Sequence, residues 1–234
     1  MIIDHPRPTD IPRLRQLWQQ AFGDSDGFLD DFFRTGFSYR RCRCLWKSGV
    51  LSAALYWFDA QVEGEKAAYL YAIATEKSFR GQGLCHLLMA STHAHLLDQG
   101  YALAVLLPGS EALEKFYAGM GYRSFGNRSR VSSALPEGGF GTPVTVYQYR
   151  QVRQALLPKG AVAQTGAFYD FLRDQAVFYA GEDFAVAVSR QAPQVVLEYL
   201  PAQAAPEGEG RIKGMYLPLT ENAPIPQYLG LAME

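Results

Sequence analysis

The sequence has few cysteines and no long apolar run. Its 234 residues include three cysteines, Cys42, Cys44 and Cys85, and the first residues show no basic and apolar signal segment. An odd number of cysteines without such a signal is typical of reduced thiols, so we expect a cytoplasmic protein. The sequence also lacks a run of about 18 apolar residues, which argues against a membrane-spanning helix.

The sequence also has almost no net charge. Its 22 basic and 23 acidic side chains give a formal charge of −1, whereas 48% of the residues are hydrophobic. This hydrophobic content is ordinary for a globular core and argues against a long disordered tail. The charge gives no electrostatic reason to expect nucleic acid or an anionic membrane as the main partner.

Apolar spacing predicts an α/β protein in which antiparallel hairpins come first and a β-α-β-α unit follows. A first helix is expected at residues 9–22, with Thr9 as N-cap, Pro12 in the first turn and Gly23 as the stop. A second, short helix is expected around residues 28–33. The further elements expected in the first 150 residues are strands at 41–47, 50–58 and 66–75, a helix at 81–99, a strand at 102–107, a helix at 111–118 capped by Ser110, and strands at 122–125 and 144–149.

The most informative segment follows the strand at 66–75. There the sequence Arg80-Gly81-Gln82-Gly83-Leu84 leads into a helix. Glycines let the backbone approach a ligand, and the first turn of a helix presents unpaired N–H groups that suit a pyrophosphate. Alone, this pattern is more often a turn without a ligand.

A second motif favours the interpretation that this loop binds a ligand. The helix at 111–118 ends in Phe116-Tyr117, followed by Gly121-Tyr122, and lies beyond one intervening strand. This pair of motifs, in this order of elements, resembles the GNAT superfamily of N-acetyltransferases over residues 1–150. The resemblance implies a splayed mixed sheet, with acetyl-CoA in the gap between the strands at 66–75 and 102–107. No metal is expected.

The resemblance also assigns site residues. Backbone groups of Ala72 and Ile73 match those that pair with the pantetheine arm. The loop amides that hold the pyrophosphate match Arg80, Gly81, Gln82, Gly83, Leu84 and Cys85. Tyr117 matches the general acid, because a phenol can protonate the departing thiolate of coenzyme A. Ser78 and Ser110 depart from the usual family residues, but neither change removes a backbone contact.

Other reactive side chains are weaker candidates. Four carboxylates could serve as the general base by sequence proximity alone, and none is assigned: Glu63, Glu65, Glu76 and Glu111. Cys42 and Cys44 share one strand face but lack two further ligands at a spacing typical of a metal site. His86 and His93 are expected on an exposed helix face, and His95 is expected to be buried. Cys85 could accept an acyl group in principle.

The last third of the chain suggests a second, smaller unit. Seven of the 13 prolines lie beyond residue 150, and residues 202–210 form a loop by composition. A helix near 168–177 and strands near 184–189, 195–200 and 213–217 repeat the order of the front half. We therefore expect a GNAT domain at residues 1–150 and a degenerate, partial GNAT-like unit at 151–234, with chance similarity as the alternative. This tandem arrangement resembles acetyltransferases of the enhanced-intracellular-survival type.

The expected function is transfer of an acetyl group from acetyl-CoA to a primary amine by direct attack. The acceptor is a small amine or an exposed amino group, in a pocket made by the early helices, the loop at 126–143 and the C-terminal unit. Self-association into a homo-oligomer is left open. One alternative is a non-catalytic module that binds or senses CoA. Another is a tandem-GNAT transferase that uses aminoacyl-tRNA, which would require a basic groove.

Overall fold

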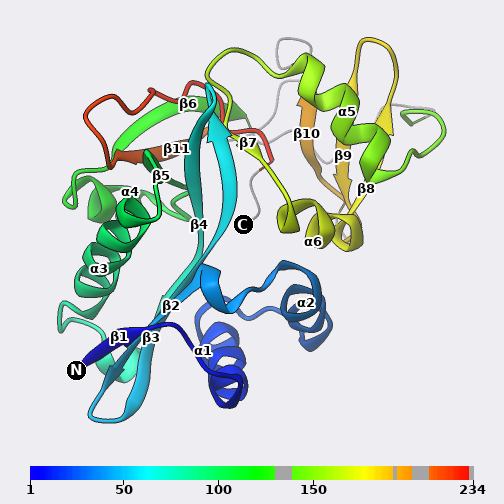
Figure 1. The fold of residues 1–234 in the computed structure, drawn as a ribbon. Coiled ribbons are helices and arrows are strands. Elements are labelled where there is room, and N and C mark those ends of the chain that lie inside the picture. Colours follow the sequence, from blue (N-terminus) through cyan, green and yellow to red (C-terminus); the bar gives the residue numbers. More distant parts are fainter. Residues whose placement is uncertain (130–138, 192–193, 202–210, 232–234) are drawn as a thin grey trace.

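One large sheet organises the computed structural model, which describes residues 1–129, 139–191, 194–201 and 211–231 (Figure 1). This eight-stranded sheet has the order β1-β2-β3-β4-β5-β11-β6, and β7 pairs with β3. Its strands are β1 (Ile2–Asp4), β2 (Cys42–Lys47), β3 (Val50–Val62), β4 (Glu65–Thr75), β5 (Leu103–Leu106), β6 (Arg123–Ser129), β7 (Ala163–Gln164) and β11 (Arg211–Pro218). Within it β4 and β5 run parallel, and the other paired strands of the described residues run antiparallel.

Side chains of the central strands divide between two apolar layers. On β3, Leu55 and Trp57 belong to one cluster, and Tyr56 belongs to the other. This alternation follows from the two-residue period of a strand. The first layer is completed by α3 (Leu84–Asp98) and α4 (Glu111–Ala118), and the second by α1 (Ile11–Phe22), α2 (Asp26–Asp31) and α6 (Ala167–Gln175). The sheet therefore lies between two groups of helices (Figure 1).

Aromatic rings join α6 to the N-terminal helices. The ring centre of Phe171 lies 5.4 Å from that of Phe28 and 5.5 Å from that of Phe32. Gly36 packs closely against the same ring, because a Cβ added at Gly36 would come within 3.2 Å of Phe171 Cβ. Residues from the last third of the chain thus complete the core of the first third.

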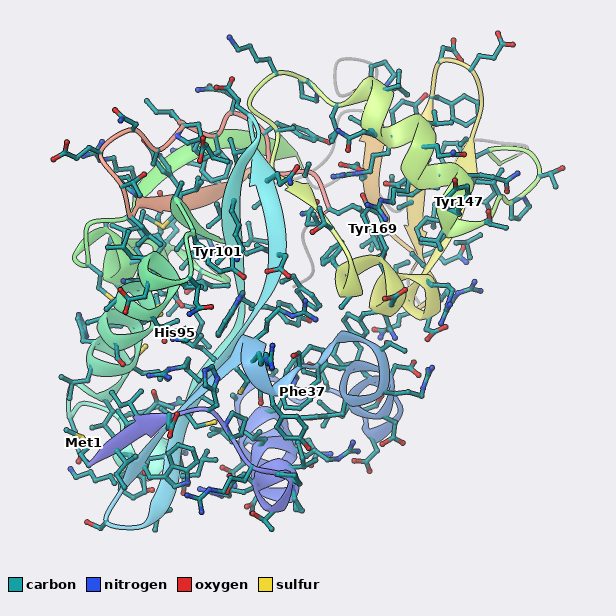
Figure 2. All side chains as sticks on the ribbon, in the orientation of Figure 1. Met1, Phe37, His95, Tyr101, Tyr147 and Tyr169 are labelled. Atoms are coloured by element: carbon teal, nitrogen blue, oxygen red, sulfur yellow. The ribbon has the colours of Figure 1, made fainter. Side chains whose placement is uncertain are left out.

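A smaller three-stranded sheet has the antiparallel order β10-β9-β8. Its strands are β8 (Ala176–Ala180), β9 (Ala185–Ser189) and β10 (Val196–Leu200). Helix α5 (Val146–Leu156) packs on it, with the ring centres of Tyr149 and Phe178 4.9 Å apart. Figure 2 places Tyr169 in this part of the molecule, away from His95 and Tyr101 beside the large sheet.

The predicted strand at 144–149 is wrong, because α5 begins at Val146. Thr145 caps this helix: its hydroxyl accepts a hydrogen bond from the Gln148 N–H (3.3 Å), and the Gln148 side chain accepts one from the Thr145 N–H (3.0 Å). Thr followed three residues later by Gln is the sequence signature of such a capping box. The β-branched residues Val144 and Val146 obscured it, because they favour a strand.

At the N-terminus, Thr9 is not the N-cap that the sequence predicted. It lies in a 3-10 turn (Pro8–Asp10), and α1 begins at Ile11 with Asp10 as its N-cap. Pro12 lies in the first turn as expected, and Gly23 ends α1 in the left-handed conformation with φ of 76°. The Ser110 cap of α4 is also confirmed, because its hydroxyl accepts a hydrogen bond from the Leu113 N–H at 3.3 Å.

The division of the chain at residue 150 stays a prediction, and two structural facts bear on it. Residue 150 lies inside α5, and β11 pairs with both β5 and β6 of the large sheet. The last long strand therefore belongs to the sheet that the first part of the chain begins. The expected loop at 202–210 and residues 130–138 of the loop at 126–143 lie outside the described residues. Within the described part of the chain, no helix is both long and apolar enough to cross a membrane.

Candidate functional site

An opening between β4 and β5 forms the centre of the candidate site. The two strands pair at Ala67 with Leu103, at Ala68 with Ala104 and at Tyr69 with Val105. Beyond Tyr69, the rest of β4 has no register partner in the described part of β5. The strands therefore separate toward their carboxyl ends, as the resemblance implied, and leave one backbone edge of β4 free of a neighbouring strand.

A β-bulge alters the backbone of β4 beside this opening. The pairing of β3 with β4 shifts between Ala54 and Tyr56, so that Ala72 and Ile73 together lie opposite Leu55. Ala72 has a φ of 47°, which is rare for a residue with a side chain. Bulges redirect backbone groups and recur next to active sites. The two residues predicted to contact pantetheine thus lie at the β-bulge, beside the opening.

The loop after β4 presents unpaired N–H groups. Gly81 and Gly83 have φ of 75° and 73°, and a Cβ added at either would meet no atom within 4 Å. Gly83 is the N-cap of α3. Among the described residues, no backbone carbonyl accepts from the N–H of residues 81–85. The loop therefore presents several backbone N–H donors at the positive end of a 15-residue helix, which is an arrangement that suits an anion.

Side chains of the loop hold its shape. The Arg80 Nε donates to the Thr75 carbonyl at 3.0 Å, and the Gln82 side-chain amide donates to the Ser78 carbonyl at 3.3 Å. Ser78 also donates through its hydroxyl to Glu76 at 3.1 Å, and Glu76 pairs with Arg13. The loop is thus tied to the end of β4 and to α1, so its amides are fixed before any ligand binds.

Tyr117 lies in the last turn of α4 and is buried, with 6% of its surface exposed. Burial raises the pKa of its phenol well above the ordinary value, and the nearby Cys85 thiol raises it further. Tyr117 makes no hydrogen bond through its hydroxyl to any described residue. The phenol is therefore protonated at neutral pH and free to donate.

Two further side chains support Tyr117. The ring centres of Tyr117 and Tyr122 are 5.7 Å apart, and the Tyr122 oxygen lies 2.8 Å from His93 Nε2. Burial raises the pKa of Tyr122 well above its ordinary value, so its hydroxyl donates and the imidazole accepts. His93 is half-buried, and the expectation that it is exposed is wrong; His86 is exposed, as expected. Packing of Tyr122 against α3 covers His93, which helical spacing alone does not show.

Burial lowers the pKa of His93 to about 4. The unfolded chain binds a proton near pH 6.5, whereas the folded protein binds it only near 4, so the free energy of unfolding falls as the pH drops through this window. In His93→Gln the glutamine can still accept from Tyr122 but cannot titrate. We therefore expect the free energy of unfolding of this variant to fall by on the order of 2 kcal/mol less between pH 7 and 4.5 than that of the unchanged protein. Urea unfolding at pH 7 and 4.5 measures it, with His86→Gln as control. An unchanged pH dependence in His93→Gln would contradict the assignment.

The structure brings the predicted site residues to one end of the sheet. The loop with residues 80–85 follows β4, the segment leading to α4 and Tyr117 follows β5, and the carboxyl ends of parallel strands meet at one edge. Glu63 and Glu65 lie at the β3–β4 turn, the opposite end of β4. Glu111 is exposed in the first turn of α4. Cys42 and Cys44 share a strand face as expected, with sulfur atoms 3.8 Å apart.

Sequence reasoning missed a polar cluster around Asp59. This carboxylate accepts from the Tyr101 hydroxyl and lies 3.0 Å from Arg41 Nη1. The available signal was one acidic residue in β3, which is otherwise apolar from Ala53 to Ala60. His95, expected to be buried, is half-buried beside this cluster, with its ring centre 5.0 Å from that of His5.

Comparison of the fold with solved structures finds several acetyltransferases. A GCN5-related N-acetyltransferase from Anabaena variabilis superposes with a TM-score of 0.71 and 14% identity, over 94% of this chain and 73% of that chain. A putative acetyltransferase from Pyrococcus horikoshii gives 0.68 and 12% identity, over 99% and 94%. Eis1 from Mycobacterium abscessus gives 0.62 and 12%, over 82% and 54%. At these identities the similarity shows a shared fold.

Sequence comparison identifies the family. No curated protein matches the chain. The family model described as an acetyltransferase (GNAT) domain matches residues 3–125, which is more than half of the chain and includes the loop at 80–85 and Tyr117. The chain therefore belongs to the GNAT acetyltransferase family.

Proposed function

We propose that the protein transfers an acetyl group from acetyl-CoA to a primary amine by direct attack, with Tyr117 as the general acid. The observation that carries this proposal is the meeting of three features at one end of the sheet. These are the opening between β4 and β5, the loop of unpaired N–H groups at 81–85, and the buried, protonated phenol of Tyr117.

The chain offers groups that match the parts of acetyl-CoA. Backbone groups of Ala72 and Ile73, on the free edge of β4, suit the amides of a pantetheine arm. The N–H groups of Gly81, Gln82, Gly83, Leu84 and Cys85 suit a pyrophosphate. The Arg80 N–H already donates to the Lys77 carbonyl at 3.3 Å, so Arg80 contributes its positive charge at the same loop instead. Gly81 and Gly83 leave space where side chains would stand, so phosphate oxygens can approach the backbone.

Tyr117 supplies the proton that the reaction requires at sulfur. As the amine nitrogen bonds to the thioester carbon, the carbon–sulfur bond breaks and the sulfur leaves with the electron pair. The Tyr117 hydroxyl donates its proton to that sulfur, and the amine loses one proton to solvent or to a base. The raised pKa keeps the phenol protonated at neutral pH, so it can donate a hydrogen bond, and with it the proton, as negative charge develops on the sulfur.

Cys85 is not required in this route. Burial raises the pKa of its thiol to about 11, so almost none of it is thiolate at neutral pH. We expect Cys85→Ala to retain turnover within about threefold, because the thiol is a weak nucleophile in this state. Steady-state kinetics and intact-protein mass after mixing with acetyl-CoA measure this. An acetylated protein that disappears in Cys85→Ala, together with lost turnover, would show a covalent route instead.

The proposed activity is tested with a panel of primary amines. The protein is incubated with acetyl-CoA and each amine, and N-acetylated products and free CoA are measured by mass spectrometry. The proposal predicts a product with at least one amine and release of CoA in equal amount. CoA binding without any product would instead indicate a non-catalytic module. Absence of CoA binding would contradict both the proposed acetyltransferase and the non-catalytic CoA-binding module.

A further inference from the structure

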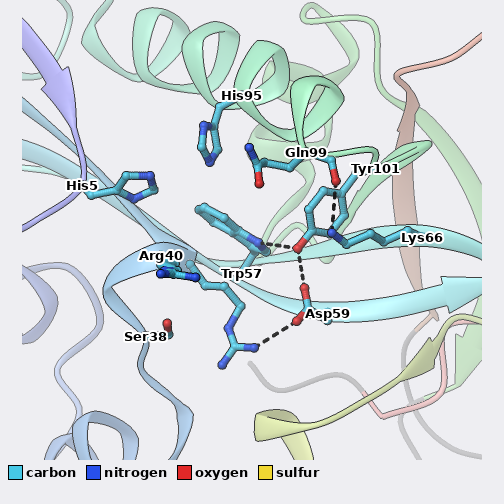
Figure 3. A pocket seen from close by; sticks show the side chains of 10 residues that line it. His5, Ser38, Arg40, Trp57, Asp59, Lys66, His95, Gln99 and Tyr101 are labelled. Carbon is cyan, nitrogen blue, oxygen red and sulfur yellow. Dashed lines mark hydrogen bonds and ion pairs between the residues drawn. The ribbon is translucent and has the colours of Figure 1, made fainter.

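A second cavity lies at the other end of β4 from the loop. It has a volume of about 530 Å³ and opens on the face of the sheet that α3 covers (Figure 3). Its lining residues are His5, Ser38, Arg40, Arg41, Trp57, Asp59, Lys66, His95, Gln99 and Tyr101. Lys66 precedes Thr75 by nine residues of extended strand, which corresponds to about 30 Å. The cavity therefore lies well away from the loop at 80–85.

Aromatic rings make one wall of this cavity. The Trp57 indole N–H donates to the Tyr101 hydroxyl at 3.2 Å, so the two rings hold each other in place. His95 extends the wall from α3, with its ring centre 6.1 Å from that of Trp57 (Figure 3). The Lys66 ammonium lies over the Tyr101 ring, 3.8 Å from its centre, and donates to the Gln99 carbonyl at 3.2 Å. Trp57 and Tyr101 have only 3% and 5% of their surfaces exposed, so the half-buried His95 ring offers more surface to a flat ligand.

The charges of the cavity favour an anion. Three cationic side chains, Arg40, Arg41 and Lys66, line it together with one carboxylate, Asp59. Asp59 already pairs with Arg41 and accepts from Tyr101. Arg40 has no ion-pair partner among the described residues, and Arg41 Nε is buried without a hydrogen-bond partner there. A buried donor without a partner is costly, and a carboxylate oxygen would satisfy it.

We propose that this cavity binds a small organic monoanion, a carboxylate carried on a planar ring. The carboxylate would pair with Arg40 and Arg41, and the ring would pack on His95 and on the small exposed parts of Trp57 and Tyr101. The volume lies within the usual range for small-molecule sites. A doubly charged phosphate fits less well, because Asp59 repels the second charge. This site is independent of the proposed acetyl transfer.

The test uses benzoate as the probe and the intact protein. Titration is followed by the NMR signal of the Trp57 indole N–H, with Trp57→Phe used for its assignment. We expect saturable binding that weakens at least about tenfold in Arg40→Gln, because a charge-assisted hydrogen bond is lost. Arg190→Gln, which removes an exposed arginine outside the cavity, should bind benzoate like the unchanged protein. Arg40 is exposed and has no ion-pair partner within the described ranges, so its replacement should not affect folding.

Two further titrations complete the test. Inorganic phosphate and cyclohexylamine should each bind more weakly than benzoate, since one lacks the ring and the other lacks the negative charge. Benzoate should bind equally with and without saturating CoA. Absence of saturable binding, equal affinity in Arg40→Gln, tighter binding of phosphate, or competition between benzoate and CoA would each overturn the proposal.

Discussion

Replacing Tyr117 by phenylalanine is expected to lower kcat by about 10²- to 10⁴-fold, the usual contribution of a general acid. The ring and its packing against Tyr122 remain, so the fold and the affinity for CoA should change little. Without the phenolic proton, the sulfur must leave as a bare thiolate in a buried site, which raises the barrier. Steady-state kinetics at saturating substrates, with CoA affinity measured by calorimetry, provide the test.

Tyr147→Phe is the matched control, because it makes the same chemical change at a tyrosine with 66% of its surface exposed. Its turnover should equal that of the unchanged protein. Because its pKa is raised, Tyr117 stays protonated below about pH 10, and we expect no fall in turnover from its deprotonation in that range. Unchanged turnover in Tyr117→Phe across this range would remove Tyr117 from the role of general acid.

The second large effect is expected at a buried ion pair that joins the smaller sheet to α5. Arg153 and Glu198 have 0% and 2% of their surfaces exposed. Arg153 Nε lies 2.6 Å and Nη2 3.0 Å from the two carboxylate oxygens of Glu198. Tyr149 donates to the same carboxylate at 2.5 Å. Arg153 also donates to Gln164, which in turn donates to the Leu231 carbonyl. The pair thus ties α5 and β10 to β7 and to the C-terminal segment.

Glu198→Gln is expected to lower the free energy of unfolding by about 3–5 kcal/mol, because it leaves a buried guanidinium without its counter-charge. Glu182→Gln, the same change at an exposed position between β8 and β9, should have almost no effect. Urea unfolding at pH 7 measures both variants. A loss in Glu198→Gln no larger than in Glu182→Gln would show that the pair is not needed for stability.

Short motifs in the sequence point to a candidate site, whereas apolar spacing describes the last third of the chain less well. The sequence singled out the loop at 80–85 by its glycines, and Gly81 and Gly83 do have positive φ. The roles proposed for this loop and for Tyr117 stay predictions. The helices at 9–22, 81–99 and 111–118 followed from apolar spacing, and the mixed sheet followed from the resemblance to the GNAT superfamily. The helix at Val146 was missed because β-branched residues hid its capping box.

The pairing of strands that are distant in the chain could not be predicted from the sequence. Nothing in residues 211–218 shows that β11 lies between β5 and β6, because a strand's neighbours depend on the whole topology rather than on its own pattern. The cavity around Asp59 was missed for a related reason. Its residues come from five separate segments, and only folding brings Arg41, Asp59 and Tyr101 together.

The most direct test of the central claim is to map where CoA binds. The claim is that the opening between β4 and β5 and the loop after β4 hold it. Backbone amide NMR signals are recorded while CoA is added. The account predicts the largest shifts at residues 81–85, with shifts at Ala72 and Ile73, and little change around Arg153. Shifts confined to other parts of the chain, or no shift at saturating CoA, would contradict it.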